Sequence, residues 1–247
     1  MLKYISLGII QGMTEFLPVS SSGHLAIAQK IFGITEGLVE LDIVLHLGTL
    51  FAVVFFFFKD ILKSARNLKL LALIAVVTLI TGVIGIMGKD FFEGLFSSLA
   101  AVCAAWIFSG IMLLFTRNFL DGKRQDLNIK DAVILGITQA IAIIPGISRS
   151  GITISTLLWR RIDRLTAFSF SFLVFVPVIL GAALFKAKNI GFAFRTEAGN
   201  LSAGFIFSCL SGFLALWLLK RVLVKAKFHY FGYYCIAMAI VVFLFVK

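Results

Sequence analysis

Long apolar runs separated by short charged segments dominate this chain. Six runs approach the roughly 20 residues that a helix needs to cross a bilayer, and they predict membrane spans at 41–58, 70–88, 95–116, 165–185, 201–219 and 230–246. Two other apolar stretches, 4–29 and 132–159, are interrupted by proline, glycine, serine and charged residues, so neither half is long enough to span. Irregular backbone at membrane depth must be buried in protein or line a wet cavity. We therefore predict two re-entrant helix–loop–helix hairpins.

The composition also indicates a membrane protein. Apolar residues make up 60% and charged residues 14% of the 247 residues, whereas charged residues make up about a quarter of an ordinary soluble domain. A disordered chain, which needs low hydrophobicity, is excluded. The formal net charge of +11 would by itself suggest a nucleic-acid partner. Because the basic residues lie in short clusters between apolar runs, we expect a membrane and no nucleic acid.

The basic clusters predict the orientation. Of the 23 lysines and arginines, 15 lie in four segments, 59–69, 117–130, 160–164 and 220–227. The positive-inside rule assigns these segments to the cytoplasm. With six spans, both termini then lie outside, as do the connections at 30–40, 89–94 and 186–200. The first hairpin enters from the outer face and the second from the cytoplasmic face.

An internal repeat relates the two interrupted stretches. A shift of 128 residues makes seven of the 19 positions in 7–25 identical, where chance would give roughly two. Each hairpin is followed by three spans, an odd number, so the second copy must be inverted. We predict one all-α membrane domain of two inverted repeats, 1–128 and 129–247. Such repeats place the substrate site near the midplane, where the broken segments meet.

The two copies differ in chemistry inside the hairpins. Three of the aligned pairs that differ change the chemistry, namely Glu15 and Ile143, Ser21 and Arg149, and His24 and Ile152. One hairpin thus contributes an acid, an imidazole and hydroxyls, and the other a guanidinium and hydroxyls. An ionisable group at the bilayer centre costs at least about 2.5–3.5 kcal/mol. The acid and the guanidinium are therefore expected to pair with each other or with a ligand.

Arg149 lies in a Pro-Gly-x-Ser-Arg-Ser-Gly loop that leads into a predicted helix. Glycine lets the backbone approach a ligand closely, free N–H groups at a helix N-terminus bind anions, and guanidinium binds phosphate bidentately. Ser148, Ser150 and Thr153 add donors. The spacing is not that of a Walker loop, so the pattern predicts a phosphate site without a nucleotide. The alternative is that Arg149 only bridges to Glu15 and locks the two halves together.

The first hairpin offers groups for catalysis. Glu15 could be a general base or a metal ligand, because Mg²⁺ is typically held by one or two carboxylates with substrate phosphates. His24 could exchange a proton, and Ser21 could be a nucleophile if Glu15 or His24 activates it. The alternatives are helix capping for Ser21 and packing for His24. We interpret His46 as a structural or supporting residue, and Phe55–Phe58 as lipid-facing anchors.

The two motifs resemble those of a known family. Residues 11–24, QGMTEFLPVSSSGH, and 145–153, PGISRSGIT, resemble the signature motifs of the bacterial undecaprenyl-diphosphate phosphatases of the bacitracin-resistance type. The resemblance implies an integral enzyme of the bacterial inner membrane with an outward-facing active site. It would remove the terminal phosphate of a C55 polyprenyl diphosphate and so recycle the lipid carrier of cell-wall synthesis.

The resemblance also implies roles for individual residues. Glu15, His24 and Arg149 would be essential, with Ser21 the proposed nucleophile and a divalent metal, Mg²⁺ or Ca²⁺, as cofactor. Position 11 is Gln rather than the commoner Glu, so the metal donors expected are Glu15 and Gln11. Further residues expected at the substrate are Gln11, Ser20, Ser22, Ser148, Ser150 and Thr153.

Two other possibilities concern function and assembly. Inverted repeats with broken helices are also transporter architecture, so a carrier or flippase of a lipid phosphate or small anion is the alternative function. Release of inorganic phosphate from a polyprenyl diphosphate would distinguish the two. A homodimer is a candidate assembly.

Overall fold

The computed structural model describes residues 1–34, 38–96, 98–186 and 193–245, and over these residues the chain is helical. The first half contains α1 (Leu2–Phe16), α2 (Ser21–Phe32), α3 (Leu38–Phe56), α4 (Phe58–Ala65), α5 (Leu68–Met87), α6 (Lys89–Phe96) and α7 (Leu99–Phe115). A 3-10 turn, η1 (Thr116–Phe119), is followed by α8 (Ile129–Ile141), α9 (Arg149–Trp159), α10 (Arg164–Lys186), α11 (Ala193–Val224) and α12 (Tyr230–Phe245). The predicted all-α class is confirmed.

Five helices in the described part of the chain are long and apolar enough to cross a membrane. They are Val39–Phe56, Leu68–Met87, Leu99–Phe119, Arg164–Leu184 and Glu197–Val224. Each overlaps one predicted span. The sixth prediction, 230–246, corresponds to α12, which is apolar but only 16 residues long. At 1.5 Å per residue α12 is about 24 Å long, less than the roughly 30 Å of a bilayer core.

Both interrupted stretches form two helices joined by a loop, as predicted. In the first, Leu17 precedes Pro18 and takes the extended conformation (φ −66°, ψ 142°) that a residue before proline prefers. Ser20 then has a φ of 67°, which is uncommon for a residue other than glycine. In the second loop Gly146 has a φ of 96°, a conformation that glycine adopts without strain.

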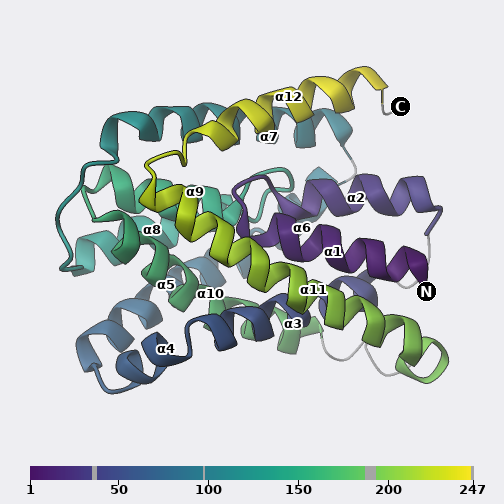
Figure 1. Cartoon of the computed structure of the whole chain (residues 1–247), viewed down its shortest axis with the longest axis horizontal. Coiled ribbons are helices and arrows are strands. Elements are labelled where there is room, and N and C mark those ends of the chain that lie inside the picture. The colour runs from purple at the N-terminus through teal and green to yellow at the C-terminus, as the bar shows by residue number, and fades with distance from the viewer. Residues whose placement is uncertain (35–37, 97, 187–192, 246–247) are drawn as a thin grey trace.

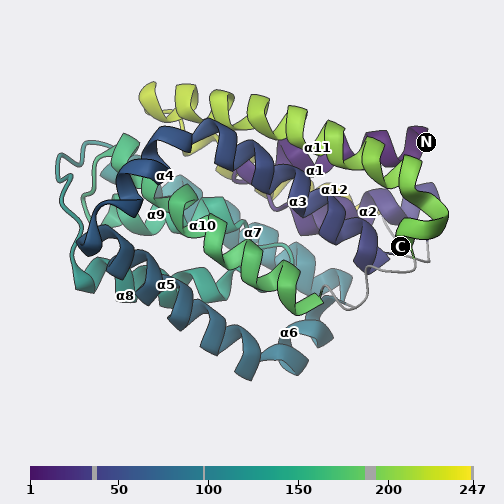
Figure 2. The same ribbon diagram turned by 90° about the horizontal axis from the view of Figure 1, so that it is seen from below.

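Helices from opposite halves of the chain pack along each other. Figure 1 shows α1 beside α11 and α7 beside α12, and α5 packs along α8. Glycines permit the closest approach, because a Cβ atom on Gly8 would lie 2.5 Å from the Gly204 carbonyl oxygen and one on Gly12 only 2.0 Å from Ser211 Oγ. In both views α1 begins and α12 ends at one end of the bundle, while α4 and the connection from α7 to α8 lie at the other (Figure 2).

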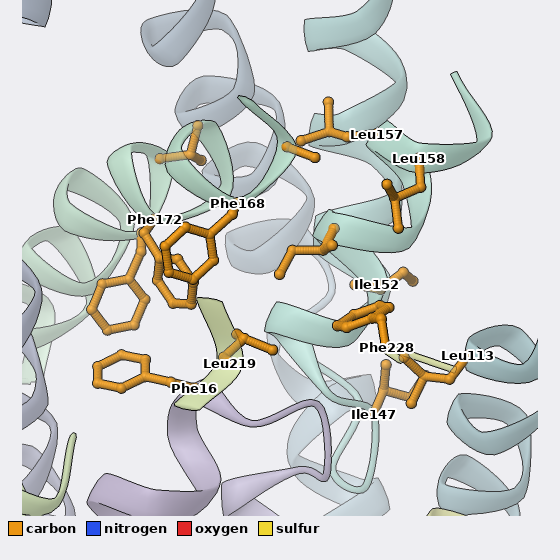
Figure 3. Close-up of a cluster of buried hydrophobic side chains, with 14 of the residues drawn as sticks. Phe16, Leu113, Ile147, Ile152, Leu157, Leu158, Phe168, Phe172, Leu219 and Phe228 are labelled. Atoms are coloured by element: carbon orange, nitrogen blue, oxygen red, sulfur yellow. The ribbon is translucent and has the colours of Figure 1, made fainter. Parts of the chain in front are cut away.

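A cluster of phenylalanines joins the end of α1 to α10 (Figure 3). The ring of Phe16 meets Phe172 and Phe175 edge-on, with centroid distances of 5.4 and 5.7 Å. Phe57, between α3 and α4, packs on Phe168 and Phe172 at 5.2 and 5.5 Å. Aromatic pairs in such arrangements stabilise beyond the area they bury. The cluster therefore anchors the first hairpin against α10.

The prediction that Phe55–Phe58 all face lipid is wrong for Phe57 and for Phe56, which is half-buried and packs on Phe57, Phe168 and Phe213. Phe55 and Phe58 are 67% and 56% exposed, whereas Phe57 is 2% exposed and belongs to the aromatic cluster. Successive side chains of a helix point about 100° apart, so four in a row cannot share one face.

Candidate functional site

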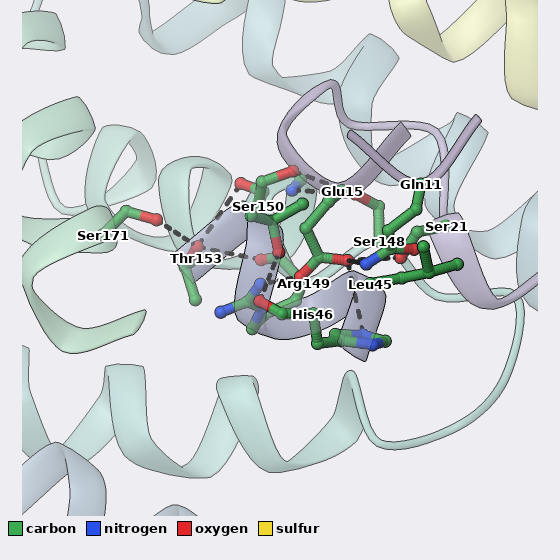
Figure 4. A network of polar contacts seen from close by, with 12 residues as sticks. Gln11, Glu15, Ser21, Leu45, His46, Ser148, Arg149, Ser150, Thr153 and Ser171 are labelled. Carbon is green, nitrogen blue, oxygen red and sulfur yellow. Dashed lines mark hydrogen bonds and ion pairs between the residues drawn. The ribbon is translucent and has the colours of Figure 1, made fainter. Parts of the chain in front are cut away.

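The two loops bring Glu15 and Arg149 together, as the sequence predicts. Glu15 lies in the last turn of α1, and Arg149 is the first residue of α9. Arg149 Nη2 donates to Glu15 Oε1 in an ion pair (Figure 4). The side chain of Glu15 is 4% exposed and that of Arg149 is 17% exposed. Because a buried charge is costly unless it is paired, each residue stabilises the other in this position.

The second carboxylate oxygen of Glu15 gathers the other polar groups of the first hairpin. Glu15 Oε2 accepts hydrogen bonds from Ser21 Oγ at 2.5 Å and from Gln11 Nε2 at 3.2 Å. His46 Nε2 of α3 lies 3.8 Å from the same oxygen. A hydroxyl that donates to a carboxylate is the arrangement of a nucleophile beside its base.

Arg149 is also held by an aromatic ring. Its Cζ atom lies 3.8 Å from the centroid of the Phe175 ring, which is buried against Phe16. A guanidinium over a ring face is attracted by the ring quadrupole, most strongly when water is excluded. The aromatic cluster of the core therefore positions the guanidinium of the site.

The hydroxyls of the second loop serve mainly the loop itself. Ser148 Oγ accepts from Gly151 N at 3.1 Å and so caps α9, and it lies 3.2 Å from Ser150 Oγ. Thr153 Oγ1 donates to the Arg149 carbonyl at 2.8 Å and lies 2.6 Å from Ser171 Oγ of α10. These bonds fix the start of α9, and with it the position of Arg149.

A cavity of about 370 Å³ opens beside the ion pair. Its polar lining includes Glu15, Ser20, Ser21, Ser22, His46, Thr81, Gln139, Ser148 and Arg149. Ile143 and part of α10, including Val178 and Ile179, form an apolar wall. The volume is in the range of small-ligand pockets. The cavity can take a charged head group and a short apolar segment.

Four predicted site residues do not line this cavity, among the residues that the structure describes. Gln11 is fully buried and donates to Glu15 from behind the cavity wall. Ser150 and Thr153 bond within the second loop and α10, as described above. His24 Nδ1 faces the Ser20 carbonyl at 2.7 Å, and His24 Nε2 faces the hydroxyl of Tyr234 in α12 at 2.8 Å. His24 therefore lies behind the loop that carries Ser21.

Other residues at the site were not predicted to act there. Gln139 lines the cavity and donates to Thr81 Oγ1 at 3.0 Å, and its alignment with Gln11 in the repeat was an available signal. His46 Nε2 lies 3.8 Å from Glu15, and its Nδ1 lies 2.7 Å from the carbonyl of Asp42, one helical turn earlier. The spacing of Asp42 and His46 in the sequence was a weaker signal of a role at the site. No sequence signal distinguished Phe175 from the other phenylalanines, of which the chain has 27 in all.

The donor set for a metal is small. Among the described residues there is no group of three or more His, Cys, Asp or Glu side chains that could hold an ion. Glu15 supplies a carboxylate, and Gln11 Oε1 beside it is buried without a hydrogen-bond partner in the described part of the chain. One carboxylate and one amide oxygen fit an ion whose remaining ligands come from substrate phosphates and water.

Comparisons with known proteins show the family of this chain. The family described as bacitracin resistance protein BacA matches residues 4–241. An undecaprenyl-diphosphatase of Carboxydothermus hydrogenoformans is 38% identical over 92% of this chain and 90% of the relative. One of Halothermothrix orenii is 39% identical over 94% and 93%, and undecaprenyl-diphosphatase 3 of Bacillus cereus is 36% identical over 98% and 95%. The chain belongs to the BacA bacitracin resistance family of multi-pass membrane proteins.

Proposed function

We propose that this protein hydrolyses undecaprenyl diphosphate to undecaprenyl phosphate and inorganic phosphate. The observation that carries the proposal is the contact of Ser21 and Arg149 with one buried carboxylate, Glu15, at the wall of a cavity. The relatives named undecaprenyl-diphosphatase match nearly the whole chain, and the family match over residues 4–241 includes both loops. The product is the lipid carrier used in cell-wall synthesis, and bacitracin resistance follows from its regeneration.

The chemistry follows from the contacts of Glu15. When the diphosphate enters, its charge competes with the carboxylate for Arg149, and the guanidinium binds the phosphates. Glu15 is then free to accept the proton of Ser21 as Oγ attacks the terminal phosphorus. The bridging P–O bond breaks and undecaprenyl phosphate leaves. Water next attacks the phosphoserine, the P–Oγ bond breaks, phosphate leaves, and the proton returns from Glu15 to Ser21.

Direct attack by water that Glu15 activates would yield the same products. The short Ser21–Glu15 hydrogen bond favours serine as the nucleophile. Both nitrogens of His24 are engaged away from Ser21, so Glu15 rather than His24 is the base in this proposal. Trapping of a phosphoserine at Ser21 during turnover is the expected result, and its absence in rapidly quenched samples would favour water.

A divalent ion, Mg²⁺ or Ca²⁺, would be held by Glu15 and by the Oε1 atom of Gln11. Its chemistry would be to offset the negative charge of the diphosphate. The partnerless Gln11 Oε1 supports this assignment. Removal of divalent ions by EDTA is expected to abolish phosphate release, and addition of Mg²⁺ or Ca²⁺ to restore it.

We also propose that the chain is a single domain of two inverted repeats, 1–128 and 129–247. Equivalent contacts under the 128-residue shift support it. The Gly8 carbonyl accepts from Ser211 Oγ of α11 at 3.3 Å, and the Gly136 carbonyl accepts from Thr81 Oγ1 of α5 at 3.1 Å. The leading helix of each half thus packs on the second span of the other half, as a pseudo-two-fold axis requires.

The same proposal includes six crossings, two re-entrant hairpins and a cavity that opens outside the bacterial inner membrane. The start of α3 and the end of α10, which both line the cavity, lie toward the end where α1 begins (Figure 2). The basic α4 and the connection from α7 to α8 lie at the opposite end, which the positive-inside rule assigns to the cytoplasm.

Purified protein in detergent tests the function directly. The wild type is expected to release phosphate from undecaprenyl diphosphate, and Glu15→Ala and Arg149→Ala to lower the rate by roughly 10³-fold, because both act on developing charge. Arg117→Ala, at an exposed arginine, is the matched control and should keep the wild-type rate. Absence of phosphate release by the wild type with Mg²⁺ present would contradict the proposal and favour a carrier.

A further inference from the structure

The contacts of His24 define one form of its ring. A carbonyl oxygen can only accept, so the 2.7 Å contact with the Ser20 carbonyl places a hydrogen on Nδ1. In the neutral ring Nε2 is then an acceptor, and the Tyr234 hydroxyl at 2.8 Å must donate to it. The Ser20 carbonyl therefore specifies which nitrogen of the neutral ring carries the hydrogen, and Tyr234 bonds the other.

Aromatic rings hold His24 from two sides. The ring of Tyr234 stacks on it with a centroid distance of 5.8 Å and an interplanar angle of 11°, and Trp106 of α7 meets it edge-on at 5.4 Å and 77°. Gly23 is needed here, because a Cβ atom at that position would lie 2.6 Å from the Trp106 ring. The imidazole therefore has one orientation.

The α7–α12 helix pair holds the whole first loop. Trp106 Nε1 donates to the Val19 carbonyl at 2.9 Å, and the thiol of Cys235 donates to the Pro18 carbonyl at 3.3 Å. His24 adds the third contact, to the carbonyl of Ser20, whose φ of 67° is unfavourable for a side chain other than glycine. The carbonyls of Pro18, Val19 and Ser20 are thus each held by a side chain. Cys235 and Trp106 hold the first two, and His24, which α7 and α12 orient, holds the third.

We propose that Tyr234 is a positioning residue for hydrolysis. Its hydroxyl bonds Nε2 and sets the direction of His24, His24 holds the Ser20 carbonyl, and the Ser20 backbone presents Ser21 to Glu15. The proposal rests on the proposed function, since it concerns the geometry of the group that reacts. It also accounts for a His24 that lies behind the loop rather than in the cavity.

Tyr234→Phe tests the proposal, because it keeps the stacked ring and removes only the donor. The expected result is a kcat lowered roughly 10- to 100-fold with KM within about twofold, since small displacements of a reacting group have effects of this size. Tyr233→Phe, at an exposed neighbour on the same helix, is the matched control and should leave kcat unchanged.

Nitrogen-15 NMR of histidine-labelled protein measures the hydrogen bonding of the His24 ring directly, which separates this proposal from a purely structural role of Tyr234. The chain has three histidines, so a His24→Gln variant assigns the signal. His24 should show the Nδ1–H tautomer in the wild type, and its Nε2 signal should shift in Tyr234→Phe because the hydrogen bond to that nitrogen is lost. An unchanged kcat in Tyr234→Phe, or a lowered kcat with an unchanged Nε2 signal, overturns the proposal.

Failure of the proposed function would look different. If the wild type releases no phosphate, the reaction assigned to the site is wrong, and a role for Tyr234 in it is wrong as well. The NMR comparison still decides whether Tyr234 sets the state of His24.

Discussion

Two buried carboxylates, Glu15 and Asp131, each pair with arginine, but only Glu15 borders the cavity between the hairpins. Asp131, in the first turn of α8, accepts from Arg124 Nη1 and Nη2 at 2.7 Å each, from Arg160 Nε at 2.9 Å and from the Asn128 backbone at 3.0 Å. Its side chain is fully buried. A carboxylate whose acceptor positions are all used by the protein holds the fold together.

Glu15 has similar partners in a different setting. Its arginine and its serine both line the cavity, and the neighbouring Gln11 Oε1 has no partner in the described part of the chain. A ligand in the cavity can therefore replace the partners of Glu15, whereas the partners of Asp131 are not at the cavity. The comparison teaches that access, rather than the presence of an ion pair, distinguishes the reactive carboxylate from the structural one.

The largest effect is expected from exchanging the charges of the reactive pair. Glu15→Arg combined with Arg149→Glu retains an ion pair but moves the guanidinium and the carboxylate away from their targets. Thermal stability in detergent should recover toward that of the wild type, relative to either single variant. Hydrolysis should stay at least roughly 10³-fold below wild type, because charge stabilisation depends on placement. Recovery of more than a tenth of the activity would mean that Arg149 only locks the halves.

The structural pair should respond in the opposite way. Asp131→Ala removes four hydrogen bonds and leaves two arginines partly exposed to solvent, at a cost in unfolding free energy of about 2 kcal/mol. The specific activity of the folded fraction should remain within about twofold of wild type. Thermal unfolding and kcat measured on one preparation check both expectations. Loss of activity without loss of stability would place Asp131 in the reaction.

A smaller effect is expected at the ring beneath Arg149. Phe175→Leu removes the cation–π contact while keeping an apolar side chain, and should lower kcat/KM by about fivefold, equivalent to roughly 1 kcal/mol. Phe168→Leu is the control, because its ring packs in the same cluster, on Phe57 and Phe172. Equal kcat/KM values in the two variants would show that Phe175 serves packing alone.

The smallest effect concerns acid stability. Burial alone would raise the pKa of Asp131, but hydrogen bonds from Arg124, Asn128 and Arg160 outweigh it and lower the pKa from 3.8 to about 2. The stabilisation is therefore complete above the unfolded value and is lost as pH falls from about 4 to about 2. The melting temperature of the wild type should fall by about 2–4 °C more than that of Asp131→Asn over this interval. Parallel curves would exclude Asp131 as the titrating group.

Much of the architecture could be predicted from local features of the sequence. Apolar length specified the spans, Pro18 and Gly146 marked the loops, and the repeat indicated that Glu15 and Arg149 would meet. These signals are short in range, or they depend on a shift that aligns one half of the chain with the other. The last predicted span, 230–246, agrees with α12 over all the residues that the structure describes there.

The surroundings of individual side chains could not be predicted in the same way. The direction of His24 depends on Tyr234, which is 210 residues away in the sequence. Thr153 carries a hydroxyl like the other donors of its loop, but Ser171 of α10 takes it out of the cavity. Phe57 is buried by Phe168 and Phe172 of α10, more than 100 residues away in the sequence. Each outcome was decided by a contact between distant segments.

The size of the cavity has a consequence for kinetics. A space of about 370 Å³ holds the charged end of the lipid, so most of a 55-carbon chain remains among the acyl chains of the bilayer. Encounter is then a two-dimensional process within the lipid sheet. The apparent Michaelis constant is a surface mole fraction, and adding inert lipid at constant bulk substrate dilutes the substrate and slows turnover.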